Sequence, residues 1–586
     1  MAASLLVFAP AAGWGAAAPS GVGVFPIPGS LVASPQAQIA FRGIPSSQLE
    51  SASIQVSGSR SGVHTGVVEA DSDGDGGSFI PSTPFQPGET VTVTTSLDVL
   101  GGTAGAFHFI VATPAGVLPY QKHLTAGRVP GDVWRFRSRP DLAPAAVRVL
   151  KRTSAAGGAD IFVAPQYGPV QDGPEILDSH GRLVWFDRVA PGDMATDFEV
   201  QSYDHQPVLT WWQGYSSAGV GIGQDMIYNS FYRPVAVVHA ADGVYADLHD
   251  FEITPWGTAL ITAYYPVYWS AASVHGPKKE IVFDSIVQEI DIPTGLLLFE
   301  WDSLDHVPLR DSYQPVPAQG AKHGTLNPYD YFHVNSVVPD SDRNFVISAR
   351  DTWAAYKVNH QTGAIMWTLG GKASSFRMGP GSAFAFQHDV GLQGPGDQLV
   401  TVFDDGGGPP NVHPQSRGLE LALDFTNMTA RLVSQDEHSP PLLADFEGDF
   451  QQLPDADRFI GWGQQPYFTE YDSRGRQILD GRFVGDTATY RAYLFPWSGT
   501  PAFPPAVVAS TSRRTTTVYV SWNGATAVGS WRVESGRAPK KLRTVATVRK
   551  RGFETAIKIP AARYVCVQAL GGRGGVVGNS ATVRVR

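Results

Sequence analysis

Apolar and polar residues alternate in short runs along most of the chain, which is the period of a half-buried β-strand. Between residues 22 and 145 the runs "QAQIAFRG", "SASIQVSG", "ETVTVTTSLDV" and "AGAFHFIVAT" are separated by turns rich in Gly, Pro, Ser and Asp. Strands of this length and spacing are typical of a β-sandwich. We therefore predict an N-terminal β-sandwich over residues 22–145.

A longer pattern repeats between residues 150 and 498. The segments "HDFEITPWGTALITAYY", "HVNSVVPDSDRNFVISARD" and "HDVGLQGPGDQLVTVFDDG" share one plan: a His, a short strand, a turn and an apolar strand. The segments "TDFEVQSYDHQPVLTWW" and "GDFQQLPDADRFIGWG" follow the plan without the His. A second hairpin, such as "AAYKVNHQTGAIMWTLGG", follows each of them, so every repeat offers the four strands of one propeller blade.

Five such repeats, together with "ADIFVAP" and "GPEILDSHGRLVWFDR" closed by "YRAYLFPW", predict a six-bladed β-propeller over residues 150–498. Residues 501–586 hold seven further short strands and predict a fibronectin type III-like sandwich. The 63 Gly, 44 Pro and 11% aromatic residues agree with many short strands and turns. The predicted fold class is all-β, a propeller flanked by two sandwiches.

The net charge of -10 is divided unevenly along the chain. From Pro501 onward there are 15 Lys and Arg against Glu534 and Glu554, which leaves 29 Lys and Arg against 52 Asp and Glu elsewhere. A basic domain on an acidic body could hold the protein near an anionic cell-surface polymer, or it could simply keep the protein soluble. We predict no nucleic-acid partner, and the sequence does not define an oligomeric state.

The opening "MAASLLVFAPAAGWGAAAPSG" combines an apolar run with small residues but lacks the usual basic start. It predicts a cleavable leader over residues 1–21 and a secreted or extracytoplasmic protein. No later stretch reaches the roughly 20 apolar residues of a membrane-spanning helix. The single cysteine, Cys566, allows no disulfide within the chain and is predicted to be a structural strand residue.

The stretch "DSDGDGG", which starts at Asp71, resembles the beginning of a calcium loop. The twelfth position of that loop is Ser82, where a calcium loop would carry a Glu. A plain turn is therefore the favoured interpretation of residues 71–77.

Three histidines occupy one equivalent position in successive repeats: His249, His333 and His388. The first strand of each propeller blade lines the central channel, so we expect these side chains to converge near the axis. In the second repeat, a turn over residues 339–344 would pair residue 338 with 345 and place His333 opposite Arg350. Asn335 would lie on the same face as His333, so one hairpin would deliver an imidazole, an amide and a guanidinium.

An Arg, an Asn and several His, with no equally obvious ring of carboxylates, suit a tetrahedral oxyanion. Three histidines also suit zinc, but an Arg beside a dication is unfavourable without a bound anion, so we predict no metal. These side chains could also do no more than satisfy backbone groups of the inner strands.

The motifs "HVNSVV…ISARD", "TGAIMWTLGG", "FQHDV", "VFDDGG" and "HDFEI" resemble the bacterial and fungal arylsulfotransferase family, whose enzymes move a sulfuryl group between phenols without the nucleotide donor PAPS. The resemblance covers the predicted propeller. It implies that His388 is the nucleophile and becomes sulfohistidine, that His249 and His333 are further active-site histidines, and that Arg350 and Asn335 bind sulfate. The chain cannot form the disulfide seen in some members, and Asp389 beside the nucleophile points to a separate branch.

The resemblance thus implies an aryl sulfate sulfotransferase that uses an aryl sulfate donor, a phenolic acceptor and no cofactor. Its mechanism would be ping-pong, with His249 or His333 donating a proton and later accepting one. Two alternatives stay open: a non-catalytic secreted propeller that binds glycans or anionic ligands, and a metal-dependent lyase or hydrolase.

Overall fold

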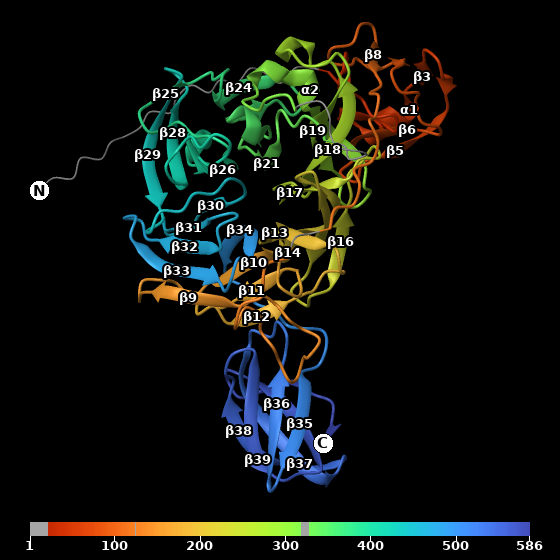
Figure 1. Ribbon diagram of the computed structural model, residues 1–586. Helices are drawn as coiled ribbons and strands as arrows, with labels where there is room; N and C mark the ends of the chain where they lie inside the picture. The colour runs from red at the N-terminus through yellow and green to blue at the C-terminus, as the bar shows by residue number, and fades with distance from the viewer. Residues whose placement is uncertain (1–20, 123–124, 318–326) are drawn as a thin grey trace, which may run out of the picture.

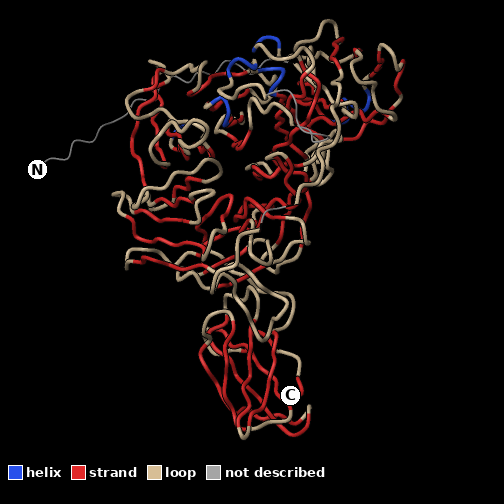
Figure 2. Tube along the Cα trace, viewed as in Figure 1, coloured by secondary structure: helices blue, strands red, loops and turns tan. Residues whose placement is uncertain are grey.

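The computed structural model describes residues 21–122, 125–317 and 327–586, and strands dominate these ranges (Figures 1 and 2). The helical elements within them are α1 (Ser46–Ser51), α2 (Ser303–His306) and four short 3-10 turns. None of these helices is long and apolar enough to cross a bilayer. The predicted all-β class is confirmed, whereas the predicted leader lies, except for residue 21, outside the described residues.

Two four-stranded sheets share one hydrophobic core in the N-terminal part of the chain. Their strand orders are β1-β2-β6-β5 and β4-β3-β7-β8. Phe41, Val93 and Phe109 are fully buried in this core. The strands are β1 (Gly23–Phe25), β2 (Ile39–Pro45), β3 (Ile54–Gly58), β4 (Gly62–His64), β5 (Gly66–Ala70), β6 (Asp75–Pro81), β7 (Thr90–Thr95) and β8 (Ala106–Ile110).

An arginine fills the loop that resembles a calcium site. Arg42 of β2 forms ion pairs with Asp71 at 2.6 Å and with Asp73 at 2.7 Å. The guanidinium therefore lies where a cation would have to bind between these carboxylates. Ser72 in the same loop donates a hydrogen bond to Asp291 at 2.6 Å, so the loop also joins the N-terminal sheets to the central part of the chain.

The central part of the chain consists of sheets that follow one another around a common centre (Figure 1), and their strands are antiparallel except for the parallel pair β25 and β29. Their strand orders are β12-β11-β10-β34, β13-β14-β15-β17-β18-β19-β20, β21-β22-β23-β24, β25-β29-β28-β27-β26 and β30-β31-β32-β33-β9, and β16 pairs with β15. In the longest sheet a single bridge, Gly223 to Ala246, joins β15 to β17. The arrangement is propeller-like, and a count of six blades, which requires dividing the long sheet at that bridge, stays a prediction.

The strands of the central part are β9 (Val147–Arg152), β10 (Asp160–Gln166), β11 (Glu175–Leu177), β12 (Leu183–Phe186), β13 (Met194–Tyr203), β14 (Gln206–Ser217), β15 (Val220–Tyr228), β16 (Pro234–Val238), β17 (Ala246–Ile253), β18 (Ala259–Trp269), β19 (Glu280–Ile290), β20 (Leu297–Asp302), β21 (Val334–Pro339), β22 (Phe345–Ala349), β23 (Ala354–Val358), β24 (Ile365–Gly370), β25 (Arg377–Met378), β26 (His388–Gln393), β27 (Leu399–Asp404), β28 (Arg417–Asp424), β29 (Thr429–Glu437), β30 (Asp449–Gln452), β31 (Arg458–Gly461), β32 (Tyr467–Tyr471), β33 (Gln477–Phe483) and β34 (Ala488–Phe495).

Strands from opposite ends of the central part pair with each other in two sheets. β34 pairs with β10, as expected for a closing strand, and places Leu494 opposite Ile161. β9 pairs with β33 and places Val149 opposite Gly481, a pairing that the sequence pattern did not reveal. Two strand ladders therefore join the two ends of the central part.

Side chains of successive inner strands bind the backbone of the next inner strand. The inner strands β13, β17, β21, β26, β30 and β34 lie side by side around the centre. Five contacts, which we call the inter-sheet latches, link them: Asp197 Oδ2 to Phe251 N (3.2 Å), Asp250 Oδ2 to Val337 N (2.6 Å), Ser336 Oγ to Val390 N (3.1 Å), Asp389 Oδ2 to Phe450 N (2.8 Å) and Asp449 Oδ1 to Ala492 N (2.8 Å).

A β-bulge near the latch residue recurs in four inner strands. The register shifts in β13, β17, β21 and β26. Asp197 and Asp389 adopt positive φ angles of 53° and 50° within this irregularity. Because a bulge re-aims a side chain out of the regular ladder, it lets these carboxylates reach sideways to the neighbouring sheet.

One buried arginine lies among the latch carboxylates. Arg491 of β34 pairs with Asp197 at 2.9 Å and with Asp250 at 2.6 Å. A third carboxylate, that of Asp389, lies 3.9 Å away. Removing one partner of such a buried pair is costly because it leaves an uncompensated charge. Arg491 therefore supplies the positive charge that the ring of latches requires.

The C-terminal strands form two sheets around a separate core, below the ring in Figure 1. Asn523 donates to Phe186 O at 2.9 Å and accepts from Phe186 N at 3.0 Å, so this part is hydrogen-bonded to β12. Cys566 is half-buried with a free thiol. Seven strands were predicted, and the structure has eight: β35 (Ala506–Ser512), β36 (Thr515–Ser521), β37 (Val528–Ala538), β38 (Lys541–Arg549), β39 (Glu554–Pro560), β40 (Tyr564–Gly571), β41 (Val576–Asn579) and β42 (Val583–Arg584).

Replacing the latch residue Asp449 by Ala is expected to destabilise the protein, because the N–H of Ala492 is left buried without an acceptor. We expect a loss of about 1–3 kcal/mol in the free energy of unfolding, measured by urea denaturation. Asp449→Asn keeps an oxygen acceptor and should recover most of that loss. The control is Asp486→Ala, at an exposed position between β33 and β34. If both Ala variants lower the free energy of unfolding equally, the hydrogen bond of Asp449 contributes no more to stability than an exposed side chain does.

Candidate active site

Each of the three predicted histidines is paired with a carboxylate through its Nδ1 atom. The pairs are His249 with Asp247 (2.5 Å), His333 with Asp330 (2.5 Å) and His388 with Asp405 (2.8 Å). A carboxylate at Nδ1 fixes the orientation of the ring and leaves Nε2 free for chemistry. This corrects the sequence analysis, which found no carboxylates to match the histidines.

Two of the three histidines pack against one aromatic residue that the sequence analysis did not select, and the third packs against one of these two histidines. The ring centroids of His249 and His333 are 4.8 Å apart. The ring of Tyr490 lies 5.7 Å from that of His249 and 6.3 Å from that of His388. Tyr490 comes from β34, and its place in the closing strand "YRAYLFPW" was the only sequence signal for it.

His388 is held as a neutral imidazole. Burial, followed by the positive charge of Arg350 and the other two histidines, lowers its pKa well below the usual value. Its Nε2 accepts a hydrogen bond from the backbone N of Glu447 at 3.3 Å, so Nδ1 carries the hydrogen and donates it to Asp405. A neutral ring with an unprotonated Nε2 is the form that can act as a nucleophile.

The other two histidines respond differently to the same kind of pairing. Burial opposes the charged form of His333, but the negative charge and hydrogen bond of Asp330 outweigh it and raise the pKa of His333. In His249 burial outweighs the attraction of Asp247, and the pKa of His249 is lowered. The site therefore combines neutral imidazoles with one that favours the cationic form.

His333 and Arg350 are neighbours across the β21–β22 hairpin, although the register differs from the predicted one. The turn pairs Val338 with Val346 instead of with residue 345. The bulge in β21 offsets this slip of one residue, and Arg350 N donates to His333 O at 2.9 Å. The predicted register was wrong because a regular ladder was assumed, and the bulge restores the juxtaposition.

The guanidinium of Arg350 is largely buried and makes three contacts. Its Nη1 lies 2.6 Å from Asp351 Oδ1, and its Nη2 donates to the carbonyl oxygen of Asp445 at 2.7 Å. The guanidinium carbon lies 4.7 Å above the ring of Phe386. Nη2 therefore binds a neutral carbonyl acceptor that an anion could replace.

Asn335 is fully buried and supports the strand that carries His388. Its Nδ2 donates to the carbonyl oxygen of Gln387 at 2.7 Å, and its Oδ1 has no partner among the described residues. Binding sulfate through Nδ2 would require this amide to leave Gln387. The predicted role of Asn335 in sulfate binding stays a prediction.

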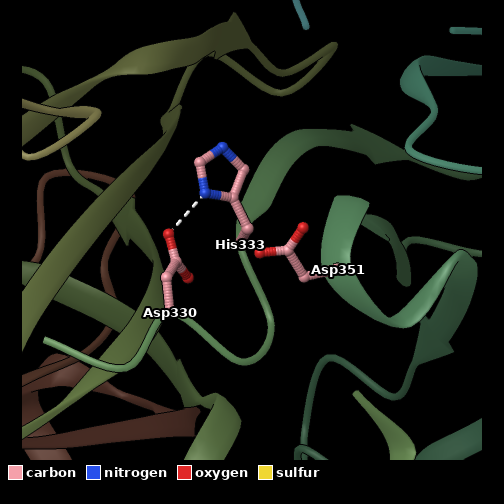
Figure 3. Close-up of side chains that lie close together, drawn as sticks. All are labelled: Asp330, His333 and Asp351. Atoms are coloured by element: carbon pink, nitrogen blue, oxygen red, sulfur yellow. Dashed lines mark hydrogen bonds and ion pairs between the residues drawn. The ribbon is translucent and has the colours of Figure 1, made fainter. Parts of the chain in front are cut away.

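Asp330, His333 and Asp351 form a cluster with the geometry of a cation site (Figure 3). One potential ligand atom from each residue lies within 4.8 Å of the others. His333 already contacts Asp330, however, and Arg350 pairs with Asp351. A metal ion would have to compete with the imidazole of His333 and the guanidinium of Arg350 for the two carboxylates. The carboxylates of Asp330 and Asp351 therefore fit these two side chains better than a divalent metal.

A row of aromatic rings leads from the surface to Arg350. Tyr313, which is 38% exposed, stacks on Trp353 with centroids 3.6 Å apart and an angle of 6°. Trp353 in turn contacts Phe386 at 5.1 Å. Trp353 and Phe386 have positive φ angles of 51° and 57°, which are strained for bulky residues and are often maintained at functional sites.

These features define a propeller-like all-β protein with a cluster of histidines and an arginine at its centre. Residues 199–484 match the family model of the arylsulfotransferases (ASST). All five predicted site residues lie within that range. This central part of the chain is therefore similar to the arylsulfotransferase family, which confirms the resemblance found in the sequence.

The chain is only distantly similar to solved structures. A protein of unknown function from Bacteroides caccae is 11% identical, with 58% of this chain and 99% of that chain covered and a TM-score of 0.35. The periplasmic gluconolactonase PpgL of Pseudomonas aeruginosa is 13% identical, with 69% and 99% covered and a TM-score of 0.29. No curated protein matches the chain. These similarities add nothing to the family assignment.

Asp330→Asn is expected to reduce stability in a pH-dependent way. Because the pKa of His333 is raised in the folded protein, this histidine stabilises the fold fully below its unfolded pKa of about 6.5, and the gain is lost as the pH rises through the folded value. The loss in unfolding free energy should thus be larger at pH 5.5 than at pH 9 in urea denaturation. Asp98→Asn, at an exposed site, serves as control, and a pH-independent loss would contradict the charge pairing.

Proposed function

We propose that this protein is a PAPS-independent aryl sulfate sulfotransferase that moves a sulfuryl group from an aryl sulfate to a phenol. The observation that carries the proposal is the neutral His388, whose Nδ1 is held by Asp405 and whose pKa is lowered by burial and then by the nearby Arg350. The family assignment supports the same class of reaction. A buried, unprotonated imidazole beside a guanidinium suits attack on a sulfur that carries negative oxygens.

The sulfate group of the donor would bind to Arg350 and His333. The guanidinium would exchange the carbonyl of Asp445 for a sulfate oxygen, and the cationic form of His333 would add a second positive charge. Charge-assisted hydrogen bonds are roughly twice as strong as neutral ones, so the anion is favoured in this exchange.

Transfer would follow a ping-pong course through a sulfohistidine. Nε2 of His388 attacks sulfur in line, the bond from sulfur to the aryl oxygen breaks, and the phenol departs. Asp405 stabilises the positive charge that develops on the imidazole, as a carboxylate does beside a catalytic histidine. A phenolic acceptor then takes the sulfuryl group and restores His388. Positioning and electrostatic stabilisation carry most of the rate enhancement, because such transfers have loose transition states.

The aryl group would lie along the aromatic row of Tyr313, Trp353 and Phe386. The row ends at Arg350, so a ring that stacks there carries its sulfate toward the guanidinium. Aromatic pairs contribute about 0.5–1.5 kcal/mol beyond the area that they bury.

We extend the proposal to the setting of this site. The central sheets form a six-bladed propeller when the long sheet is divided between β16 and β17, and the flanking sheets form an N-terminal sandwich and a fibronectin type III-like domain. The protein is exported by its leader, and the basic C-terminal domain holds it near an anionic polymer. The predicted domain limits, 22–145, 150–498 and 501–586, follow from this division.

A non-catalytic anion-binding protein is the second candidate. Its support is that Arg350 and His388 already hydrogen-bond the backbone of Asp445 and Glu447, so the polar groups of the site are satisfied without a reaction. Removal of the His388 imidazole distinguishes the two functions. It should abolish transfer, which needs the nucleophile, but should only weaken anion binding, which needs charge.

His388→Ala is expected to abolish transfer. Purified protein is mixed with 4-nitrophenyl sulfate and phenol without PAPS, and nitrophenolate release is followed together with the mass of the peptide that contains His388. We expect acceptor-dependent release and an acid-labile gain of one sulfuryl group, both absent in His388→Ala. His239→Ala, at an exposed histidine, should leave both signals unchanged. Absence of release and adduct in the wild type across several aryl sulfates would favour the anion-binding protein.

Tyr313→Ala should weaken binding of the aryl group without impairing the chemical step. Loss of one stacking partner predicts a rise in KM for the aryl sulfate of about 2- to 10-fold with little change in kcat. The matched control is Tyr245→Ala, which removes a tyrosine that is 51% exposed in the connection before β17. A fall in kcat at constant KM would place the aryl group somewhere other than along this row.

A further inference from the structure

The segment Asp445–Glu447 crosses the candidate site and touches both of its central groups. The carbonyl oxygen of Asp445 accepts from Arg350 Nη2 at 2.7 Å. Two residues later, the backbone N of Glu447 donates to Nε2 of His388 at 3.3 Å. Glu447 is therefore the residue whose backbone lies against the nitrogen that would carry the sulfuryl group.

The carboxyl group of Glu447 is buried with only one of its two oxygens hydrogen-bonded. The residue is 7% exposed, and its Oε2 atom has no hydrogen-bond partner among the described residues. The side-chain amide of Gln166 donates from its nitrogen to Glu447 Oε1 at 3.2 Å. The oxygen of the same amide accepts a hydrogen bond from Tyr490 N at 3.2 Å. This amide connects the carboxyl group to Tyr490, whose ring packs beside His388.

The backbone of Glu447 is also strained. Its φ angle is 70°, a left-handed conformation that is unfavourable for a residue with a long side chain. A strained residue whose buried carboxyl group has one oxygen without a hydrogen-bond partner contributes little to folding. Such features gather at functional sites, where the surrounding structure maintains them.

The surroundings keep the Glu447 carboxyl group in its acid form near neutral pH. Burial raises the pKa of Glu447 to about 8, and the hydrogen bond from Gln166 offsets only part of this rise. Asp405 and Tyr167 interact with this carboxyl group, and the imidazole of His388 contacts the backbone N of Glu447. None of these three is a cation at neutral pH, because His388 is neutral. The cation of the site, Arg350, binds Asp351 and the carbonyl oxygen of Asp445.

We propose that Glu447 carries the proton of the transfer reaction, giving it to the departing phenolate and taking it back from the acceptor phenol. This inference rests on the proposed function and adds a residue to it. The alternative carriers suggested by the sequence are His249 and His333. If His333 gave up its proton, however, the site would lose one of the two positive charges that hold the sulfuryl oxygens.

The proton and electron pairs balance over the two half-reactions. Nε2 of His388 bonds to sulfur, the bond from sulfur to the aryl oxygen breaks, and the oxygen keeps the electron pair. Glu447 protonates that oxygen, directly or through one water, and becomes a carboxylate. In the second half-reaction the carboxylate takes the proton of the acceptor phenol while its oxygen bonds to sulfur. The bond from Nε2 to sulfur breaks, and its electron pair returns to His388.

The test compares two donors in wild type and Glu447→Gln. Phenyl sulfate releases a strongly basic phenolate that needs a proton, whereas 4-nitrophenyl sulfate releases a weakly basic one. General acid catalysis typically contributes 10²–10⁴-fold. We therefore expect the first-turnover release of phenol to fall at least about 100-fold, and that of nitrophenol less than about 10-fold. In the wild type, phenol release should also decline above pH 8 as the acid form is lost, and Glu447→Gln should lack this decline.

The control is Glu470→Gln, the same change at a buried carboxyl group of β32 whose pKa is also raised, to about 7. It should leave both rates unchanged. An equal fall for both donors, or no fall, in Glu447→Gln overturns the inference while the wild type still turns over. Wild type that is inactive with both donors overturns the proposed function itself. If circular dichroism shows that Glu447→Gln does not fold, Glu447→Asp replaces it. This variant must then slow the reaction with phenyl sulfate more than that with 4-nitrophenyl sulfate, and equal slowing overturns the inference.

Discussion

The arrangement of the central sheets depends on one repeated hydrogen bond, from a side chain of one inner strand to a backbone N–H of the next. Four carboxylates and Ser336 make this contact, and the ion pair of Arg491 with Asp197 joins the last inner strand to the first. Each N–H would otherwise be buried without an acceptor, at a cost of about 1–3 kcal/mol. The crowding of carboxylates is relieved by Arg491 and by burial, which raises the pKa of Asp250 to about 7.

The latches also fix the catalytic candidates, because the latch residue directly follows the histidine in two strands. Asp250 follows His249, and Asp389 follows His388. Asp389, which in the sequence analysis points to a separate branch of the family, therefore has a structural role in this fold. In β21 the latch is displaced to Ser336. Asn335 is then free to hold the carbonyl of Gln387, the residue before His388.

The sequence predicted the histidines because they recur at one position of a repeat, whereas their carboxylate partners share no common spacing. Asp247 lies two residues before His249, Asp330 lies three before His333, and Asp405 lies seventeen after His388. Each partner is brought in by the fold and not by the repeat. The same holds for Arg42, whose distance of 29 residues from Asp71 hides the ion pair that fills the apparent calcium loop.

The register error in the β21–β22 hairpin has a related cause. Alternation of apolar and polar residues defines which strands pair, but a bulge changes the register without changing that alternation much. The sequence analysis therefore predicted the β21–β22 hairpin and the proximity of His333 and Arg350 correctly. It missed the bulge in β21, which changes the register and so the direction of the side chains. The pairing of β9 with β33 was missed because β9 is short and mostly exposed, so its apolar pattern is weak.

The polar groups at the centre are preorganised because the backbone of residues 445–447 satisfies them in the absence of substrate. Arg350 binds a carbonyl oxygen, and His388 binds an N–H, so a ligand must replace these contacts and cannot simply add to them. A neutral ligand would exchange one neutral acceptor for another and gain little. A sulfate ester brings charge to Arg350, and the charge-assisted bond is the stronger one. The site thus discriminates by charge first, and the aromatic row selects among anions by shape.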